Sequence, residues 1–553
     1  MKWVEADPDP ETSASVQLLI DALAAGDRDV ERKLAGLFDG RIAFGTAGLR
    51  AALGPGPKLM NRLVVRQTTA GLMRWLTDGA LVVIGFDARH GSSAFAAEVA
   101  DVVAAMGGVA EVLPQPLPTP VLAHAVLTRG AAAGVMITAS HNPPQDNGYK
   151  LYLGDGIQLV SPDDAAIAAS IDVVAAEDPA VRYEPRPERI ITLGDEIASD
   201  HIAACCSVLA STRREVRTVY TAMHGVGGQH LMAAFAAAEF DPPVCVPEQF
   251  EPDPDFPTAD FPNPEEAGAL DLALALASDV DADLVIANDP DADRLALAVR
   301  GRDAGFVALS GDQIGVLLAD HLLRHDVAAD HPGGRVVANS VVSSRLLSRI
   351  AAARGVDATT TLTGFKWVAR PIVEQPEKHF LLGYEEAIGY CVGGVVRDKD
   401  GISAALVAAE MAADLKADGL TVWDRLDAIA VDHGLYLTAP VTVRFDGPMG
   451  NADREAAMGR FSSGPPEALG GTPLTDWFDL ADGEHFPPAT GLIANYGSTR
   501  VIVRPSGTEP KLKAYIELIE PVADLDDLDR ARSQAQERME QIQSEINAVM
   551  TGG

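Results

Sequence analysis

One pattern recurs along this chain of 553 residues and most constrains its fold. A short apolar run, rich in β-branched residues, ends in a polar or glycine-rich turn. Runs of this length that are almost continuously apolar are typical of buried strands. Alanine- and leucine-rich stretches of helical length separate them, for example at 93–105 and 267–277. This alternation continues to about residue 430 and predicts α/β domains. The clearest runs lie at 80–89, 133–143, 218–228, 282–293, 334–344 and 379–389.

Breaks in composition divide the chain into four predicted domains. The first break is a stretch rich in proline and charge at 177–190, and the second is a polar stretch near 300–304. After a third break near 432–437 the pattern changes to that of an α+β domain. We expect this last domain to hold strands near 437–445, 499–503 and 513–518 and then a helix at about 525–549. The predicted domains are 1–211, 212–302, 303–432 and 433–553.

The charge balance limits the possible partners. The chain carries 79 Asp+Glu against 44 Lys+Arg, a formal net charge of −35. Proteins that bind nucleic acid need a basic surface and an anionic membrane repels an acidic one, so we expect neither partner. No apolar stretch approaches the roughly 18 residues of a membrane span, and the acidic N-terminal segment has no apolar core of a signal peptide. Four cysteines without CxxC spacing predict reduced thiols and a cytoplasmic protein.

The first candidate site follows the apolar run at 134–137. Ser140 lies in the segment Thr-Ala-Ser-His-Asn-Pro at 138–143, at an expected strand end where its hydroxyl can be exposed. A serine hydrolase is excluded because the segment has no G-x-S-x-G elbow and because neighbours such as Ser140 and His141 seldom face each other as a catalytic pair must. The alternative is an Asn-Pro turn that only ends the strand.

A lysine follows this segment at a useful spacing. Lys150 lies ten residues after Ser140, and Asn147-Gly148 between them favours a tight turn. We expect this turn to fold the chain back and to bring Lys150 near Ser140. A lysine held among cations and partly removed from water has a lowered pKa, so it can transfer protons.

The second candidate site is a triplet of aspartates at alternate positions, Asp289, Asp291 and Asp293. Such carboxylates suit a hard divalent cation. An EF-hand is excluded because Arg294 and Arg300 occupy the positions that need Gly and Glu. A second triplet with the same spacing, at 279–283, precedes the strand expected at 284–287. Ligands gather at the carboxyl ends of strands, so we assign the metal to the triplet that follows this strand and read the other as a solvated acidic turn.

Two further loops follow expected strands. Residues 504–511 combine an arginine, two hydroxyls and a glycine, which suit a phosphate clamp, and a charged turn is the alternative. The clamp residues would be Arg504, Ser506, Gly507 and Thr508. Residues 383–389 carry Glu385 and Glu386, for which we keep three readings open: acid/base catalysis, binding of sugar hydroxyls and plain solvation. Upstream, Lys366 lies in another loop.

Lysine is scarce and unevenly placed. The chain has ten lysines, and none lies between Leu151 and Phe365. Half of them fall in or beside the candidate loops, which predicts a cationic, phosphate-binding cleft in an acidic protein. These five are Lys150, Lys366, Lys399, Lys511 and Lys513.

Taken together, these motifs resemble those of the α-D-phosphohexomutase superfamily, the phosphoglucomutase/phosphomannomutase enzymes. Segment 138–143 resembles the family's phosphoserine loop, 289–294 its metal loop, 383–389 its sugar-specificity loop and 504–511 its phosphate-binding loop. Residues 45–50 resemble its N-terminal active-site segment. The motifs occur in family order over residues 45 to 513, and jointly they are highly specific.

The resemblance implies three related α/β domains with mixed sheets and a C-terminal α+β domain like the TATA-box-binding protein, around a central cleft. It also implies one Mg²⁺ per chain, a phosphoserine at Ser140 and a sugar 1,6-bisphosphate as activator. The implied metal ligands are Asp289, Asp291, Asp293 and the phosphorylated Ser140. The implied roles elsewhere are acid/base catalysis for Lys150, support of the reacting phosphoryl for His141, Arg50 and Arg294, sugar binding for Glu385 and substrate binding for Lys366, Arg504, Ser506, Gly507 and Thr508.

One departure bears on the choice of sugar. The family commonly has Glu-x-Ser in the sugar loop, whereas Glu385 is followed here by Glu386 and Ala387. This form, with Asp-Lys-Asp-Gly at 398–401, looks more like the phosphoglucomutase-2 and phosphopentomutase branch. From the resemblance as a whole we expect a monomeric or dimeric mutase that moves a phosphoryl group between the 1- and 6-positions of a hexose phosphate. The alternatives are a phosphopentomutase, a glucose-1,6-bisphosphate synthase, a Mg²⁺-dependent phosphatase and a catalytically silent sugar-phosphate sensor.

Overall fold

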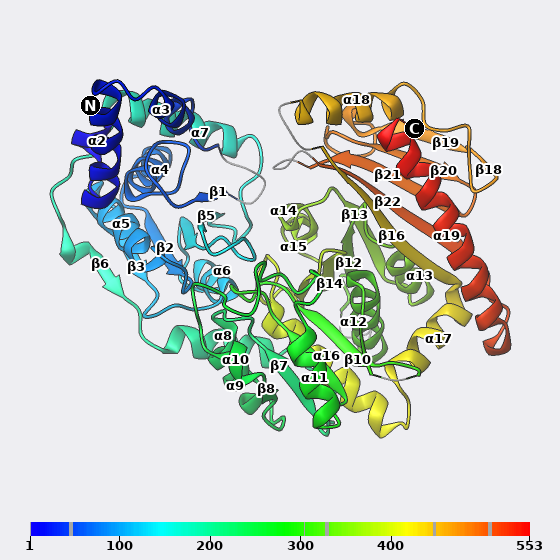
Figure 1. Cartoon of the computed structure of the whole chain (residues 1–553). Helices are drawn as coiled ribbons and strands as arrows, with labels where there is room; N and C mark the ends of the chain where they lie inside the picture. Colours follow the sequence, from blue (N-terminus) through cyan, green and yellow to red (C-terminus); the bar gives the residue numbers. More distant parts are fainter. Residues whose placement is uncertain are drawn as a thin grey trace. The chain divides into compact units, whose positions relative to one another are not determined.

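The computed structural model describes residues 2–43, 48–303, 305–326, 331–445, 449–506 and 511–552. Figure 1 shows the chain coloured along its sequence. The chain divides into two compact units, which are described separately. Unit 1 comprises Met1–Leu309, Ile372–Pro376 and Ala387–Asp414, and unit 2 comprises Ser310–Pro371, Glu377–Glu386 and Leu415–Gly553.

Unit 1 begins with three helices, α1 (Lys2–Ala6), α2 (Pro10–Ala24) and α3 (Asp29–Phe38). A six-stranded sheet follows, in the order β1-β5-β4-β2-β3-β6. Strands β2, β3, β4 and β6 are parallel, whereas β5 and β1 are antiparallel to their neighbours. The strands are β1 (Leu49–Ala52), β2 (Leu81–Phe86), β3 (Val109–Val112), β4 (Ala133–Ile137), β5 (Asp146–Leu153) and β6 (Ile190–Thr192).

Helices cover both faces of this sheet, which explains its almost continuous apolar strands. Val82 and Ile84 of β2 pack with helices on one face, while Val83 packs on the other, because side chains alternate along a strand. The first face carries α4 (Arg62–Trp75), α5 (Ser92–Ala105) and α7 (Asp163–Glu177). The second carries α6 (Thr119–Thr128) and α8 (Glu196–Cys206).

A second sheet of unit 1 repeats the same plan, in the order β11-β10-β9-β7-β8. Its parallel strands β8, β7 and β9 are followed by antiparallel β10 and β11. In both sheets a loop joins a central parallel strand to an antiparallel one, and each loop has one left-handed residue, Ser140 (φ 54°) or Ala292 (φ 53°). The elements are β7 (Thr218–Thr221), α9 (Gly227–Ala237), β8 (Val244–Cys245), α10 (Pro247–Phe250), α11 (Asp271–Asp279), β9 (Leu284–Ala287), β10 (Ala296–Arg300) and β11 (Phe306–Ala308).

Unit 2 contains a parallel group of strands in the order β13-β12-β14. These are β12 (Arg335–Ser340), β13 (Asp357–Thr361) and β14 (His379–Glu385). The accompanying helices are α12 (Gly311–His325), α13 (Leu346–Ala353), α14 (Phe365–Val368), α15 (Arg370–Glu374), α16 (Gly401–Ala417) and α17 (Val422–His433), of which α15 and α16 run across the division between the units. Strand β15 (Gly389–Val392) belongs to unit 1.

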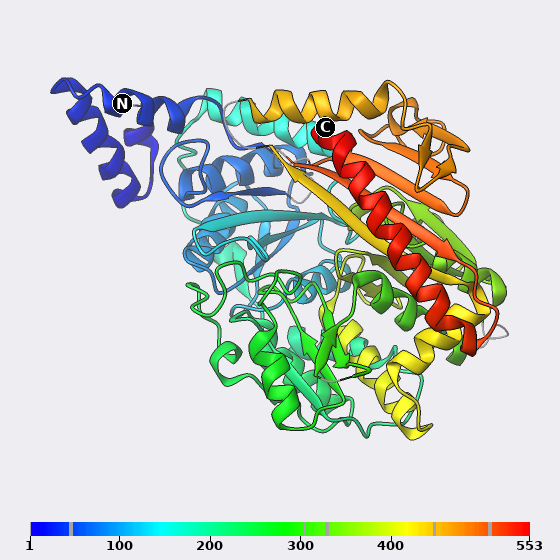
Figure 2. The same ribbon diagram turned by 45° about the vertical axis from the view of Figure 1, so that its right-hand side comes forward.

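The C-terminal part of unit 2 is an antiparallel sheet in the order β16-β22-β21-β20-β19. Figure 2 shows the long helix α19 (Leu528–Thr551) lying across it. This helix buries residues three or four positions apart, including Ala535, Met539 and Ile542, against the strands. The other elements are β16 (Leu435–Arg444), α18 (Gly450–Ser462), β17 (Ala468–Leu469), β18 (Thr472–Pro473), β19 (Asp476–Asp479), β20 (Leu492–Tyr496), β21 (Thr499–Pro505) and β22 (Lys511–Glu520).

The mixed α/β sheets and the α+β C-terminal part confirm the predicted fold class. The predicted turn at Asn147-Gly148 is wrong, because both residues lie in β5 and pair with Ala51 and Arg50 of β1. The chain turns earlier, where the Asp146 amide donates to the Pro143 carbonyl. Several described elements were not predicted from the sequence, among them α2, α18, β19 and β20. Among the described helices, none is long and apolar enough to cross a membrane.

Candidate active site

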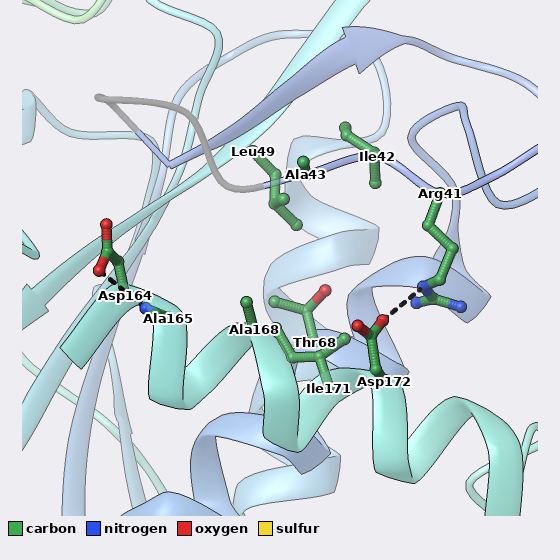
Figure 3. Close-up of a pocket in the computed structure, with 10 residues that line it drawn as sticks. All are labelled: Arg41, Ile42, Ala43, Leu49, Thr68, Asp164, Ala165, Ala168, Ile171 and Asp172. Atoms are coloured by element: carbon green, nitrogen blue, oxygen red, sulfur yellow. Dashed lines mark hydrogen bonds and ion pairs between the residues drawn. The ribbon is translucent and has the colours of Figure 1, made fainter. Parts of the chain in front are cut away.

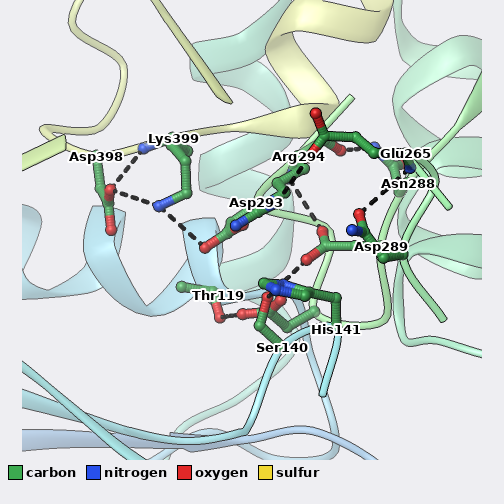
Figure 4. Close-up of polar contacts among 12 residues, drawn as sticks. Thr119, Ser140, His141, Glu265, Asn288, Asp289, Asp293, Arg294, Asp398 and Lys399 are labelled. Carbon is green, nitrogen blue, oxygen red and sulfur yellow. Dashed lines mark hydrogen bonds and ion pairs between the residues drawn. The ribbon is translucent and has the colours of Figure 1, made fainter. Parts of the chain in front are cut away.

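Ser140 lies at the carboxyl end of β4, as predicted, and is 1% exposed. Its amide donates to the Thr138 hydroxyl at 2.9 Å, which helps to hold the left-handed backbone. Its Oγ donates to Asp289 Oδ2 at 2.7 Å and lies 3.1 Å from Nδ1 of His141 (Figure 4). The serine of the first loop therefore meets the first aspartate of the metal loop, 149 residues further along the chain.

Arg89 holds the Ser140 loop through hydrogen bonds to its backbone. This role of Arg89 was not predicted from the sequence. Its guanidinium donates to four carbonyl oxygens of the loop, those of residues 140, 142, 143 and 146, at 2.5 to 3.2 Å. Asp87 lies 3.4 Å from Arg89 Nε. Both residues are buried and follow β2, the strand beside β4. The strand-end rule that identified Ser140 also applies to them, so it could have found them.

The aspartate triplet forms a compact buried cluster after β9. Asp289, Asp291 and Asp293 are at most 1% exposed, and one carboxylate oxygen of each lies within 4.8 Å of the others. Thr119 at the start of α6 donates to Asp291 Oδ2 at 2.5 Å, and the Arg294 amide donates to Asp289 Oδ1 at 3.0 Å. These contacts fix the direction of the carboxylates before any ligand binds.

The donor set of this cluster fits Mg²⁺. Asp291 Oδ1 and Asp293 Oδ1 are buried and accept no hydrogen bond from a described residue. Buried carboxylate oxygens without a partner are costly, and a hard cation with oxygen ligands removes that cost. Burial and the two neighbouring carboxylates raise the pKa of Asp289 to about 8. Crowded carboxylates of this kind need a positive charge to share one site.

Lys150 supplies part of that charge. It lies on β5, opposite Met136 of β4, and its ammonium donates to Asp291 Oδ2 at 2.6 Å and to Asp293 Oδ2 at 2.7 Å. The expected lowering of its pKa is wrong for this arrangement. Burial does lower the pKa of Lys150, but the two carboxylates outweigh it and raise the pKa above its ordinary value. Its chemistry therefore depends on what the carboxylates bind.

A second lysine joins the cluster from the segment at 398–401. Lys399 Nζ lies 3.2 Å from Asp293 Oδ2 and 3.2 Å from Asp398 Oδ1. Asp398 is itself held by the Tyr152 hydroxyl at 2.7 Å and by the Gln158 amide at 2.5 Å. The scarcity of lysine pointed to Lys399, but no role followed from the sequence. Asp293 thus lies between two lysines.

Three more predicted residues surround the cluster. The Nε atoms of Arg50 and Arg294 are buried and have no hydrogen-bond partner among the described residues. Arg294 also lies 3.5 Å from Glu265 (Figure 4). Burial, with these two cations close by, lowers the pKa of His141 well below its ordinary value, so this imidazole is neutral near pH 7. Arg294 Nε lies 4.0 Å from Asp293 Oδ1. Guanidinium N–H groups that make no hydrogen bond to a described residue suit an anionic ligand.

A pocket of about 300 Å³ lies elsewhere in unit 1, between β1 and α7 (Figure 3). Leu49, Ile171 and Ala168 line it, and Arg41 and Asp172 lie 3.8 Å apart in its wall. Leu49 precedes Arg50 on β1, and successive side chains on a strand point to opposite faces. The pocket is therefore on the face of β1 away from Arg50.

In unit 2 the predicted sugar loop is anchored through both glutamates. Glu385 accepts a hydrogen bond from the Gly364 amide at 2.6 Å, in the segment that carries Lys366. Glu386 Oε2 accepts from the hydroxyls of Ser340 and Ser343, each at 3.2 Å. Because of these contacts, Glu386 is not merely a solvated surface side chain, which was one of the three readings of this loop.

A buried network of unit 2 holds the serines in turn. The Arg500 guanidinium donates to the Ser343 carbonyl at 2.8 Å. Glu517 accepts from the Ser344 hydroxyl at 2.9 Å and from the Arg345 amide at 2.7 Å. The antiparallel sheet thus fixes the segment on which Glu386 rests.

The structure describes part of the predicted phosphate-binding loop. Arg504 lies in β21 opposite Lys513, and the Ser506 amide donates to the Lys511 carbonyl at 2.8 Å. Gly507 and Thr508 lie outside the described residues, as do Gly45, Thr46 and Ala47 of the N-terminal segment. Arg454 of α18 donates to the Ser506 carbonyl at 3.2 Å, a cation that the sequence did not point to. The described part of the loop is therefore basic.

Comparison with known families matches the chain to four models in order. They are described as phosphoglucomutase/phosphomannomutase alpha/beta/alpha domains I, II and III, at residues 41–177, 199–302 and 310–429, and as the C-terminal domain, at 474–535. Among curated relatives, a Haemophilus influenzae protein named "Probable phosphomannomutase" is 39% identical over 83% of this chain and 93% of its own length. The phosphopentomutase of Homo sapiens is 34% identical over 100% of this chain and 94% of its own length.

Solved structures share the architecture. A phosphoglucomutase/phosphomannomutase family protein from Burkholderia thailandensis aligns over 92% of this chain and 97% of its own, with a TM-score of 0.67 and 18% identity. At that identity the likeness supports the fold alone. With four matching domain models in family order and relatives above 30% identity over most of their length, the chain belongs to the phosphoglucomutase/phosphomannomutase family, whose members are phosphoryl-transferring isomerases.

Proposed function

We propose that the chain interconverts the 1- and 6-phosphates of a hexose through a phosphorylated Ser140 and a sugar bisphosphate. One observation carries this proposal. Ser140 Oγ lies 2.7 Å from Asp289, in a cluster where two buried carboxylate oxygens accept no hydrogen bond from a described residue. A hydroxyl that takes and returns a phosphoryl group needs such a cluster, because phosphoryl transfer depends on positioning and on neutralised charge.

Asp289, Asp291 and Asp293 would hold the Mg²⁺ of the family. When bound, Mg²⁺ supplies Lewis-acid neutralisation of phosphoryl oxygens. The Nε groups of Arg50 and Arg294, which make no hydrogen bond to a described residue, would bind further oxygens of the same phosphoryl group. Neutral His141, 3.1 Å from Ser140 Oγ, orients the hydroxyl.

Lys150 is the proposed acid and base for the sugar hydroxyl. Its ammonium is held by Asp291 and Asp293 in the described structure. A cation bound by those carboxylates weakens their hold on the proton of Lys150, so its pKa falls toward the working range of a general acid. In the first half of the cycle the sugar hydroxyl attacks phospho-Ser140 and gives its proton to Lys150. The Ser140 oxygen leaves with the electron pair of the broken bond. In the second half the bisphosphate, turned round, returns its other phosphoryl group to this oxygen, and Lys150 gives its proton to the sugar oxygen that leaves.

A second candidate substrate, a pentose phosphate, is favoured by one observation in the sugar loop. Ala387 offers no hydroxyl where the family commonly has serine. The relatives named phosphopentomutase from Mus musculus and Homo sapiens also match 95% and 100% of this chain. A sugar 1,6-bisphosphate is the proposed activator. The four cysteines are free, which supports a reducing, cytoplasmic setting for this activity.

Replacing Ser140 by alanine tests the proposal. We expect Ser140→Ala to abolish conversion of glucose 1-phosphate to glucose 6-phosphate and the phosphate adduct seen in the intact mass of the wild type. Ser161→Ala is a matched control, because its exposed hydroxyl donates to Asp164 Oδ2 at 3.1 Å, away from the aspartate cluster. Full activity in Ser140→Ala would refute the assignment.

The substrate is settled by comparing turnover of glucose, mannose and ribose 1-phosphates with the same enzyme. Free phosphate measured beside isomerised sugar phosphate separates a mutase from a phosphatase. A protein that binds sugar phosphates but neither isomerises them nor becomes phosphorylated would be a sensor. A preference for ribose 1-phosphate would replace the hexose proposal and leave the role of Ser140 intact.

A further inference from the structure

A second buried cluster of metal-binding side chains lies in unit 1, apart from the aspartate triplet. His201 and Cys205 are four residues apart on one face of α8, and Asp400 reaches them from the segment at 398–401. All three residues are 0% exposed. His230 of α9 adjoins His201. Two separate segments therefore place an imidazole, a thiol and a carboxylate in a closed space.

The three donor atoms form a triangle of the size that zinc imposes. His201 Nε2 lies 3.3 Å from Asp400 Oδ2, and Cys205 Sγ lies 3.5 Å from each of those atoms. Zinc binds nitrogen and oxygen at about 2.0–2.2 Å and sulfur at about 2.3 Å in tetrahedral geometry, so neighbouring ligands are about 3.3 to 3.6 Å apart. All three sides of the triangle fall within that range.

The 3.3 Å between His201 Nε2 and Asp400 Oδ2 is long for a hydrogen bond alone. A buried hydrogen bond between a charged carboxylate and an imidazole is normally about 2.7–2.9 Å long. The outward-facing atoms of the cluster do make good hydrogen bonds. His201 Nδ1 lies 2.9 Å from His230 Nε2, and Asp400 Oδ1 accepts from the Ile402 amide at 2.9 Å. Metal ligands are commonly oriented in this way, with the second atom of each group held by a neighbour.

We propose that His201 Nε2, Cys205 Sγ and Asp400 Oδ2 bind a structural zinc ion. The thiol proton of Cys205 leaves on binding, so one thiolate and one carboxylate balance the two charges of the ion. Nitrogen and sulfur donors favour zinc over Mg²⁺, whereas the oxygen-only aspartate triplet favours Mg²⁺. The two sites are thus chemically distinct.

The site would fasten the segment at 398–401 to α8. Lys399, which contacts Asp293, immediately precedes Asp400. An ion on Asp400 therefore fixes the backbone from which Lys399 reaches the aspartate cluster. Because structural zinc contributes to folding free energy, its loss lowers the thermal midpoint of unfolding even where the Mg²⁺ site is intact.

Cobalt is a spectroscopic probe for this site. The wild type is produced in minimal medium with Co²⁺ as the added transition metal, so that the ion enters during folding. We expect an absorption band from thiolate-to-cobalt charge transfer and one tightly held Co²⁺ that Mg²⁺ does not displace. Cobalt at the aspartate triplet gives no such band, because that site has no sulfur.

Serine substitutions assign the band. Cys205→Ser should remove it, while Cys206→Ser, the adjacent and partly exposed cysteine, should keep it. If Cys205→Ser does not fold, the band is assigned by elimination with three other variants, all of which must retain it: Cys206→Ser, Cys245→Ser and Cys391→Ser. The proposal is overturned if the wild type shows no charge-transfer band, if the zinc-grown wild type carries no zinc, or if the band survives in Cys205→Ser.

Discussion

Two aspartate triplets with the same spacing lie at opposite ends of β9. Asp279, Asp281 and Asp283 precede the strand, and Asp289, Asp291 and Asp293 follow it. The leading triplet faces solvent, where Asp281 pairs with Arg300 at 2.5 Å and its side chain is 83% exposed. The trailing triplet is buried among Ser140, Lys150 and Thr119. The same short motif therefore has two different environments.

Its position relative to the strand decides what each triplet can do. At the carboxyl end of β9, the loops of two related sheets meet, and each carboxylate finds a fixed partner. At the amino end the carboxylates contact peripheral groups, such as the Arg217 amide, which donates to Asp283 Oδ2 at 2.8 Å. Burial makes charge expensive, so only the buried triplet gains much from a cation.

The largest expected effect is a loss of kcat when the buried triplet, but not the exposed one, is changed. Asp291→Asn removes one charge from the buried triplet, and we expect kcat to fall by at least about 100-fold, because a Lewis acid at a phosphoryl group is worth several kcal/mol. Asp281→Asn changes the matching position of the exposed triplet and should leave kcat unchanged. Both are measured in the mutase assay over a range of Mg²⁺ concentrations.

Equal losses in the two variants would contradict the assignment. A loss confined to Asp281→Asn would move the metal to the amino end of β9. If the activity of Asp291→Asn returns fully at high Mg²⁺, this carboxylate contributes to Mg²⁺ affinity and not to kcat.

The next effect is on stability. An ion that binds only the folded protein stabilises it by about 2.7 kcal/mol when present at about 100 times its Kd. We therefore expect Mg²⁺ to raise the thermal midpoint of the wild type and of Asp281→Asn, and to raise that of Asp291→Asn much less. Differential scanning fluorimetry with Mg²⁺ and with EDTA measures this. A Mg²⁺-dependent rise that is equal in all three proteins would place the ion elsewhere.

A smaller effect is expected for the Ser140 loop, which contacts the buried triplet through Asp289. Arg89→Lys keeps the charge but cannot reach four carbonyl oxygens, so the Ser140 loop loosens. We expect kcat to fall by about 10- to 100-fold, as for other residues that orient reacting groups, with KM nearly unchanged. Arg300→Lys, beside the exposed triplet, is the matched control.

A purely structural role for Arg89 would lower the amount of folded protein and leave kcat per folded molecule intact. Active-site titration through the phosphate adduct on Ser140 makes this distinction. A change in KM with unchanged kcat would instead place Arg89 in substrate binding.

The sequence predicted what adjacent residues and strand ends determine. The α/β fold, Ser140 and the choice between the triplets all follow from polar residues placed after apolar runs. Arg89 and Lys399 did not acquire roles, because their roles depend on which strands and segments become neighbours. The turn propensity of Asn147-Gly148 was overridden by pairing with β1, where a Cβ on Gly148 would lie 2.5 Å from the Thr138 carbonyl oxygen.

The pKa of Lys150 was also mispredicted, because it depends on residues that are distant in the sequence. Scarce lysines in phosphate-binding loops suggested a cationic environment and a lowered pKa. The carboxylates that surround the ammonium belong to residues more than 140 positions further along the chain. They raise the pKa, and no local pattern around Lys150 announces them. Charge at a site is a property of the assembled fold.

The smallest expected effect concerns the stability of the exposed triplet itself. Asp281→Asn removes the ion pair with Arg300, whose side chain is 53% exposed. Such pairs contribute about 0.2–1 kcal/mol. Asp281 has a φ of 54°, which asparagine adopts readily, so the substitution adds no backbone strain. We therefore expect the thermal midpoint to move by no more than about 1 °C, with or without Mg²⁺. A larger fall that Mg²⁺ enhances would show that the amino end of β9 also binds a cation, and the contrast between the two ends would then rest on affinity alone.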